Sequence, residues 1–365
     1  MSDPSRKVDG FYIPSLDGLR ALSIGIVFLS HAGLGNTIPG LFGVTVFFFL
    51  SGFLITTLLR QEWAKTGTVS LSQFYLRRVL RIFPPLYLAI AAASALCLLG
   101  VIRAALTWKA FFAQTLFLAN YYEIFADGRG MPPGMSILWS LAVEEHFYLL
   151  FPLMYLGLRK ANASAAAQAA VLGAVCALVL AWRVALVRSG VSTVDGTLGW
   201  HRLAHSSDTR LDSILFGCVL AVYGNPSLDG TRIPETIWKH VLLPLGIVAL
   251  LFSFVYRDST FRSTYRYTLQ ALALVPVFVA AVRYPAWAPF RPLNWPWVRR
   301  LGVLSYSLYL LHAFLIVAVE EHLHAPRPVL MIASFALSYA AADLTYRLVE
   351  RPCAELRKRL SKARL

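Results

Sequence analysis

The sequence has few charged residues and no polar half. Only 15% of its 365 residues are Asp, Glu, Lys or Arg, and 57% are apolar. An ordinary soluble domain has about 25% charged and about 45 to 50% apolar residues. The mean hydropathy is +0.60, and the apolar runs extend along the whole chain. This composition excludes an ordinary soluble globule and predicts one body embedded in a membrane.

Cysteine is scarce and lacks the paired spacing of a zinc site or a disulfide framework. Cys97, Cys176 and Cys218 lie in apolar runs, and Cys353 lies in a basic C-terminal segment. We expect four free thiols, no bound cofactor and no metal. A cleavable signal is also missing, because the first apolar segment contains Arg20 and no small-residue cleavage pattern follows it. No Walker loop, dinucleotide-binding glycine motif or nucleophile elbow is present.

Long apolar segments predict an all-α, polytopic membrane bundle, because about 20 apolar helical residues cross a bilayer core. We expect about ten transmembrane helices. The segments are Leu16 to Ala32, Leu41 to Leu59, Pro84 to Ile102, Ile137 to Leu156, Ala167 to Val187, Leu211 to Tyr223, His240 to Val255, Tyr267 to Val282, Leu301 to Val319 and Val329 to Val349. A shorter run, Ala110 to Asn120, predicts an interfacial or re-entrant piece. Residues 1–352 form the predicted membrane domain and residues 353–365 a basic cytoplasmic tail.

Acidic residues are the scarcer charge, with 19 against 34 basic ones and a net charge of +15. With the N-terminus inside, 22 basic residues fall in inner segments, 11 in outer ones, and Arg20 lies within the first span. Cytoplasmic loops are richer in Lys and Arg, so both termini are predicted to be cytoplasmic. Because the basic residues are dispersed among loops, we expect contact with membrane lipid and no nucleic-acid partner.

Two basic residues lie in the first predicted span, where charge is costly unless it is paired or faces a cavity. Arg20 and His31 are eleven residues apart, which places them on one helical face roughly 16 Å apart along the axis. Arg20 would lie near the cytoplasmic end and His31 near the outer end. The alternatives are that Arg20 extends to the lipid headgroups and that His31 caps the helix. Their shared face favours a functional pair.

The fourth span carries Ser140, Glu144 and Tyr148 at a spacing of four residues, which also gives one shared face. Glu144 is expected at a depth comparable with that of His31. A carboxylate there can fix the tautomer of an imidazole that acts as a general base. The alternative is that Glu144 and its neighbour Glu145 pair with structural arginines.

A third cluster, Arg77, Arg78 and Arg81, is predicted on the inner side just before Pro84. Guanidinium groups bind phosphate bidentately, and Pro84 suits the first turn of a following helix, whose N-terminus also favours an anion. An anchor on anionic lipid explains the cluster equally well.

Other polar residues give weaker signals. Arg210 and Asp212 open the sixth span and can face an acceptor or pair with neighbours, and Ser305 and His312 lie in the ninth span. A lone histidine such as His312 is more often a packing residue than a catalyst. His201 and His205 are four residues apart in an outer loop, but no third metal ligand is evident.

Seven of these elements occur in one order along nearly the whole chain. They are Leu16 to Arg20 followed by His31, Gly43 to Ile55, Arg77 to Pro84, Trp139 to Tyr148, Arg210 to Asp212, Ser305 to His312, and Val349 to Pro352. In this set the chain resembles acyltransferase family 3, integral-membrane enzymes that O-acylate bacterial surface glycans and macrolides. Thr45 departs from the family's usual Asp, and His146 from its usual Gln, so we assign no role to either.

The resemblance implies a multi-pass protein of the bacterial plasma (inner) membrane that transfers an acyl group from cytoplasmic acyl-CoA. Acetyl-CoA is the expected co-substrate, and a hydroxyl of a sugar or other acceptor outside the cytoplasm is the expected target. His31 would be the catalytic histidine and Arg20 its partner. The donor would contact Arg77, Arg78 and Arg81. Ser140, Tyr148, Arg210, Asp212, Ser305 and His312 would be acceptor-side or structural polar residues.

A secondary transporter or a flippase of a polar or lipid-linked solute is the main alternative, since ten spans with intramembrane charges suit either. Transporters often show Gly- or Pro-broken helices at matching positions in two halves. No such pair is found, and the motifs are concentrated in spans one to four. Consumption of an acyl-CoA thioester would distinguish an enzyme from a transporter.

Overall fold

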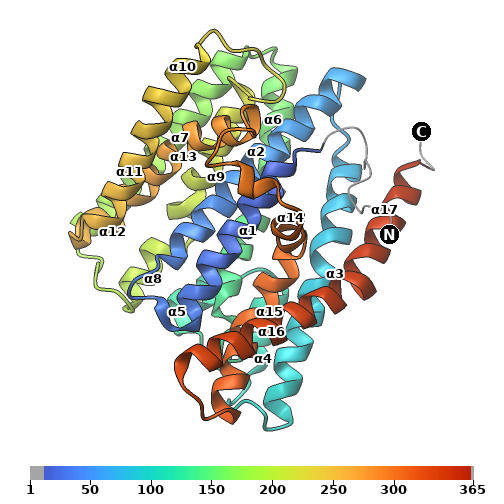
Figure 1. Cartoon of the computed structure of the whole chain (residues 1–365), viewed down its shortest axis with the longest axis vertical. Coiled ribbons are helices and arrows are strands. Elements are labelled where there is room, and N and C mark those ends of the chain that lie inside the picture. The colour runs from blue at the N-terminus through green and yellow to red at the C-terminus, as the bar shows by residue number, and fades with distance from the viewer. Residues whose placement is uncertain (1–11, 363–365) are drawn as a thin grey trace.

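A computed structural model describes residues 12–362, with side chains as far as residue 360; the two ends of the predicted domains, 1–11 and 363–365, lie outside it. Within that range the chain is helical and contains no strand (Figure 1). The first helices are α1 (Pro14–Leu29), α2 (Gly40–Thr66), α3 (Leu71–Leu98), α4 (Trp108–Thr115), α5 (Ala119–Ala126), α6 (Leu138–Lys160), α7 (Ala165–Arg188), α8 (Leu198–Ala204) and α9 (Ser207–Val222). The remaining helices are α10 (Glu235–Ile237), α11 (Leu243–Val255), α12 (Ser259–Ser263), α13 (Tyr265–Arg283), α14 (Pro296–Val303), α15 (Ser305–His322), α16 (Arg327–Thr345) and α17 (Arg351–Lys362).

Short turns of other helical types connect several of these elements. Wide π-type turns occur at Ser30–Leu34, Trp238–Leu242 and Tyr346–Glu350, and 3₁₀ turns occur at Met135–Ile137 and Arg291–Asn294.

By length and composition, seven of the described helices can cross a membrane, or eight if one bent pair counts as a span. Each predicted segment overlaps a helix, but α1 and α9 have only 16 residues each. The exact number of ten therefore stays a prediction. The multi-pass helical fold is confirmed.

Burial separates a central set of helices from a peripheral one. In α2, 72% of the most apolar stretch is buried, whereas the corresponding stretches of α7 and of the continuous helix Glu235–Val255, which ends with α11, are only 22% and 17% buried. α2 packs closely on α9, where the Cα of Gly52 faces the backbone of Ile214 and that of Gly217 faces the backbone of Phe49. The absence of a side chain lets the two backbones approach. This close packing holds the short helix α9 within the bundle.

Two predicted boundaries are wrong. Pro84 does not open a helix, because α3 begins after Ser70, whose side chain accepts a hydrogen bond from the Gln73 amide, and it continues through Pro84 and Pro85. No helix N-terminus therefore offers an anion site at this point. The ninth predicted span is broken as well, since α14 and α15 meet at a bend of 69° just before Ser305.

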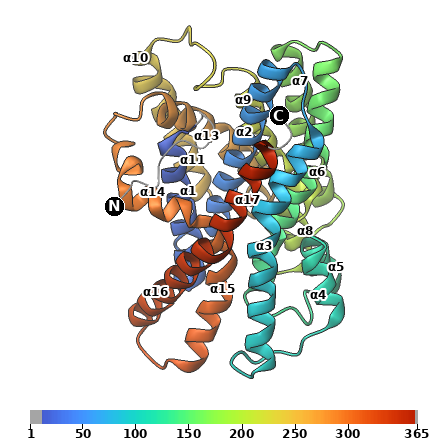
Figure 2. The ribbon, with the colours of Figure 1, turned by 90° about the vertical axis from the view of Figure 1, so that its right-hand side faces the viewer.

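The run predicted as a single interfacial piece forms two short helices. α4 and α5 are separated at Phe117, whose φ of 58° lies in the left-handed region. Both helices belong to the long connection between α3 and α6. α5 packs on α6 and α8, and α4 packs on α3 and α5 (Figure 2).

Contacts between loops agree with the predicted alternation of spans. On one face of the bundle, Arg60 pairs with Asp229 at 2.8 Å. On the other face, Arg262 pairs with Asp195 at 2.9 Å. In both pairs the partners come from loops predicted to lie on the same side. Which face is cytoplasmic remains a prediction from charge.

Candidate active site

His31 lies in the wide turn that ends α1, and its side chain lines a cavity of about 410 Å³. We call this the histidine cavity; its walls also include Trp139, Trp200 and Tyr309. The turn requires Gly33, which has a φ of 100° and packs directly against the guanidinium of Arg327. Any larger residue would be strained in this conformation and would force the Arg327 side chain to move.

The hydrogen-bond partner of His31 is His312 in α15, with 2.8 Å between His31 Nδ1 and His312 Nε2. The other ring nitrogen of His312 lies 3.0 Å from the Leu308 carbonyl and 2.8 Å from the Tyr309 carbonyl. A carbonyl can only accept, so His312 Nδ1 carries the proton and its Nε2 must accept from His31. This network leaves the lone pair of His31 on Nε2, where it can act as a base.

The structure corrects the predicted pairing of His31 with Glu144. Glu144 accepts a hydrogen bond of 3.0 Å from Ser51 and one of 3.2 Å from Tyr148. It lines a separate cavity to which His31 does not contribute. The group that fixes the tautomer of His31 is His312, which is 0% exposed.

A middle cavity of about 100 Å³ lies between α1, α2, α3, α6 and α15. It contains Glu144 and Tyr148 together with Arg20, Arg78 and Arg81. Tyr309 lines both this cavity and the histidine cavity. The Tyr309 hydroxyl is 2.6 Å from that of Ser140, which fixes the position of the phenol at the junction.

A basic cavity of about 720 Å³ adjoins the middle cavity on the opposite side from His31. Arg20, Arg81, Ser305 and Tyr306 line both of them. The histidine, middle and basic cavities thus form a series through the bundle, with the narrowest space in the centre.

The predicted arginine cluster also comes together with Arg20. A cavity of about 490 Å³, which we call the arginine cavity, is lined by Arg20, Arg77, Arg78 and Arg81. The three arginines of α3 differ in their contacts. Arg77 is paired with Glu62 at 2.9 Å. Arg78 lies over the rings of Phe74 and Tyr148, at 5.6 and 5.5 Å from their centroids. Arg78 and Arg81, but not Arg77, reach the middle cavity.

Arg20 makes an ion pair of 2.8 Å with Asp17, one turn earlier in α1. It lines the basic, middle and arginine cavities but not the histidine cavity. Arg20 and His31 therefore line cavities at opposite ends of the series.

Arg210 and Asp212 are fully buried and pair with neighbours, so they do not line the histidine cavity. Asp212 binds Arg183 through both oxygens, at 3.0 and 2.6 Å. Arg210 donates a hydrogen bond of 3.0 Å to the hydroxyl of Thr45, and its Cζ lies 3.9 Å from the centroid of Tyr267. Their contacts are structural.

A third side chain with a potential metal-ligating atom, which the sequence did not reveal, lies beside the two outer histidines. Glu123, His201 and His205 each offer a ligand atom, and all three atoms lie within 4.8 Å of one another. His205 Nδ1 is 2.8 Å from the Glu123 carboxylate, and His201 Nδ1 has no hydrogen-bond partner within the described residues. Burial lowers the pKa of His205 and the bond with Glu123 raises it, with a net lowering that favours the neutral, metal-binding form. Two imidazoles and a carboxylate are a donor set that can hold a divalent metal such as zinc.

Sequence reasoning underestimated His312 and missed Ser51, Tyr306 and Tyr309. One signal for His312 was available: His31 and His312 both fall in the later part of odd-numbered spans, which run in the same direction. The contacts of Ser51 and Tyr309 depend on helix packing and have no signature of their own.

Comparison with known proteins places this geometry in a family. Residues 13–347 match the family model for the acyltransferase 3 domain. The chain is 29% identical to the peptidoglycan O-acetyltransferase OatA of Listeria monocytogenes, over 93% of this chain and 56% of the relative. It is also 29% identical to the putative peptidoglycan O-acetyltransferase YrhL of Bacillus subtilis, over 93% of this chain and 55% of the relative.

A putative O-acetyltransferase of Staphylococcus aureus strain COL shows the same identity, 29%, over 93% of this chain and 57% of its own length. The chain thus spans little more than half the length of these relatives. No solved structure is significantly similar. The family match extends over nearly all of the chain, and the chain belongs to acyltransferase family 3.

Proposed function

We propose that the chain is a membrane O-acyltransferase that moves an acyl group from cytoplasmic acyl-CoA to a hydroxyl on the extracytoplasmic side. The observation that carries this proposal is the series of cavities that begins at Arg20 and Arg81 and ends at His31. A thin thioester arm can pass through the narrow middle cavity while its anionic end stays among the arginines. No part of the protein then has to carry the acyl group across.

The acceptor hydroxyl would bind in the histidine cavity beside His31 Nε2. His31 takes the hydroxyl proton as the oxygen attacks the thioester carbonyl carbon, which gives a tetrahedral intermediate. The Tyr309 hydroxyl lies at the junction of the cavities and would donate a hydrogen bond to the oxyanion by turning away from the Ile137 carbonyl, to which it donates at 3.0 Å. The C–S bond then breaks, the ester is released, and the thiolate of CoA takes the proton back from His31.

Acetyl is the acyl group we propose, and a glycan hydroxyl is the acceptor. This choice is supported by the relatives, two of which are described as peptidoglycan O-acetyltransferases, one of them putatively. In the predicted orientation, with more basic loops inside, the basic cavity would lie on the cytoplasmic side of the bundle, where acyl-CoA is available. The same orientation suits a protein of the bacterial inner membrane.

Consumption of acetyl-CoA by the purified chain in lipid nanodiscs tests the proposal. With a glycan acceptor present, the wild type should release free CoA and form an acetyl ester, and His31→Ala should abolish both. His322→Ala is the control, because His322 bonds to the Ala318 carbonyl and lines none of the cavities. A wild type that leaves the thioester intact while moving a solute would instead support a transporter.

A further inference from the structure

The basic cavity is walled on one side by the C-terminal helix, which the sequence presented only as a basic tail. α17 packs along α3 (Figure 2), and the segment from Arg351 onward contributes six of the residues that line this cavity. They are Arg351, Cys353, Ala354, Glu355, Arg357 and Lys358, with the first of these at the start of the helix. α17 is therefore part of the cavity wall.

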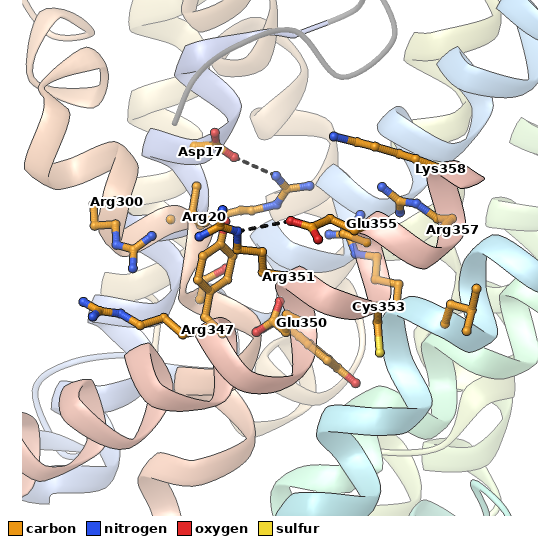
Figure 3. Close-up of a pocket in the computed structure, with 18 residues that line it drawn as sticks. Asp17, Arg20, Arg300, Arg347, Glu350, Arg351, Cys353, Glu355, Arg357 and Lys358 are labelled. Atoms are coloured by element: carbon orange, nitrogen blue, oxygen red, sulfur yellow. Dashed lines mark hydrogen bonds and ion pairs between the residues drawn. The ribbon is translucent and has the colours of Figure 1, made fainter. Parts of the chain in front are cut away.

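Three of the six cavity-lining residues of α17 are basic, namely Arg351, Arg357 and Lys358. Arg20, Arg81, Arg300 and Arg347 raise the number of basic side chains at the cavity to seven, against the three acids Asp17, Glu350 and Glu355. The cavity is thus strongly electropositive, and its bases converge from α1, α3, α14, α17 and the turn before α17 (Figure 3).

Part of this charge is neutralised within the protein. Arg300 and Arg347 both bind Asp343, the latter at 2.6 Å, and Arg351 binds Glu355 at 3.3 Å. Lys358 also lines the basic cavity, and Figure 3 shows its side chain extending from α17 toward the helix that carries Asp17 and Arg20. An excess of bases around a large open cavity fits a ligand with several negative charges.

The ligand chemistry that matches is a group of phosphates on a body of nucleotide size. The nucleotide end of CoA carries a 5′-diphosphate and a 3′-phosphate, and guanidinium and ammonium groups are the usual protein partners of phosphate. Its thioester arm leaves the diphosphate as a thin chain. Arg20 and Arg81 line both the basic and the middle cavity and so mark the entrance through which such an arm would continue.

We propose that α17 completes the donor site, and that Arg351 and Lys358 bind the phosphates of the acyl-CoA nucleotide. This inference rests on the proposed function, because it assumes that acyl-CoA is the donor. The inference adds a source of donor specificity to the proposed function. α17 would make the enzyme prefer the full CoA thioester over a thioester that lacks the nucleotide. Binding of phosphates would also hold α17 against α3 and order the wall of the cavity.

Phosphate groups also occur on anionic lipids, which are abundant at the inner surface of a bacterial membrane. The experiment must therefore separate a donor phosphate from a lipid phosphate. Varying the donor at constant lipid tests the first source, and varying the lipid at constant donor tests the second.

The test measures acetyl transfer by the full chain in nanodiscs with acetyl-CoA and with S-acetylpantetheine, which lacks the nucleotide. The double variant Arg351→Ala/Lys358→Ala is compared with the wild type. Its KM for acetyl-CoA should rise roughly tenfold or more, the loss expected for hydrogen bonds to charged groups. Its KM for S-acetylpantetheine and its kcat should not change, because Arg351 and Lys358 line neither the middle cavity nor the histidine cavity. Arg359→Ala is the control, since Arg359 carries the same charge on α17 but lines neither the basic cavity nor the arginine cavity.

Two results would overturn the inference. An equal rise in KM for both donors would mean that the substitutions disturb the structure and not the nucleotide contacts. A defect that appears in nanodiscs with anionic phosphatidylglycerol and disappears in neutral phosphatidylcholine would assign the site to a lipid headgroup. If the wild type consumes neither thioester, the proposed function itself fails, and that outcome is distinct from both of these.

Discussion

The ring nitrogens of His31 and His312 lie 2.8 Å apart, although 281 residues separate them in the chain. Because His312 donates its other N–H to backbone carbonyls of its own helix, it can only accept from His31. A buried, neutral imidazole thus orients the base. The arrangement resembles the use of a third group to orient a catalytic histidine, with imidazole in place of carboxylate.

Replacing His312 should therefore reduce turnover without removing the base. We expect His312→Ala to lower kcat by about 10²-fold, a loss of the size associated with a misplaced general base. His312→Gln should recover part of this activity, because its side-chain oxygen can accept from His31 Nδ1. The kcat and KM of the three proteins, measured with acetyl-CoA, would show this order. Equal activity in the Ala variant and the wild type would contradict the assigned tautomer.

The three arginines of α3 should differ in their effect on the donor. Arg81 lines the basic, middle and arginine cavities, whereas Arg77 lines only the arginine cavity and is paired with Glu62. Arg81→Ala is therefore expected to raise the KM for acetyl-CoA roughly tenfold, by loss of a charged contact. Arg77→Ala should raise it less and should resemble Glu62→Gln. A larger effect at Arg77 than at Arg81 would argue against the cavity series as the donor path.

The buried ion pair between Arg183 and Asp212 should be important for stability. Both side chains are 0% exposed, so Asp212→Ala leaves an unpaired charge inside the bundle. Such losses cost about 3 to 5 kcal/mol. The detergent-solubilised variant should lose its folded, monodisperse form at a clearly lower temperature than the wild type, as followed by size-exclusion chromatography after heating.

Asp195→Ala is the matched control for that substitution. Asp195 pairs with Arg262, but its side chain is 54% exposed. A pair of this kind contributes about 0 to 1 kcal/mol. Equal losses of thermal stability in the two variants would contradict the structural role given to Asp212.

The packing of α2 on α9 should not tolerate a methyl group at Gly217. A Cβ there would overlap the backbone carbonyl of Phe49, which cannot move without separating the two helices. Gly217→Ala should therefore lower the thermal midpoint by an overpacking cost of about 1 to 3 kcal/mol. Gly173→Ala in α7 is the control, because a Cβ at that position meets no neighbouring atom and favours the helix. A stable Gly217→Ala protein would show that α2 and α9 lie further apart.

The sequence by itself determined the class of fold and the residues worth examining. Apolar runs of span length need only local information, so composition and hydropathy were enough to predict a multi-pass helical bundle. The same local reasoning found Arg20, His31 and the arginines of α3, because an ionisable residue stands out in an apolar segment. The order of the motifs was enough to predict the family.

Tertiary structure alone decided how these residues are combined. The similar predicted depth of Glu144 and His31 in the membrane suggested that they pair. Helix packing instead places Glu144 in a hydrogen bond with Ser51, and His31 in one with His312. Pro84 marks a helix start by local rules, but the helix continues through it because packing in the bundle outweighs the local cost. α17 carries a basic composition that suits any anionic surface, and only its position against α3 makes it the wall of a cavity. These outcomes depend on contacts between segments far apart in the chain, and no local pattern contains that information.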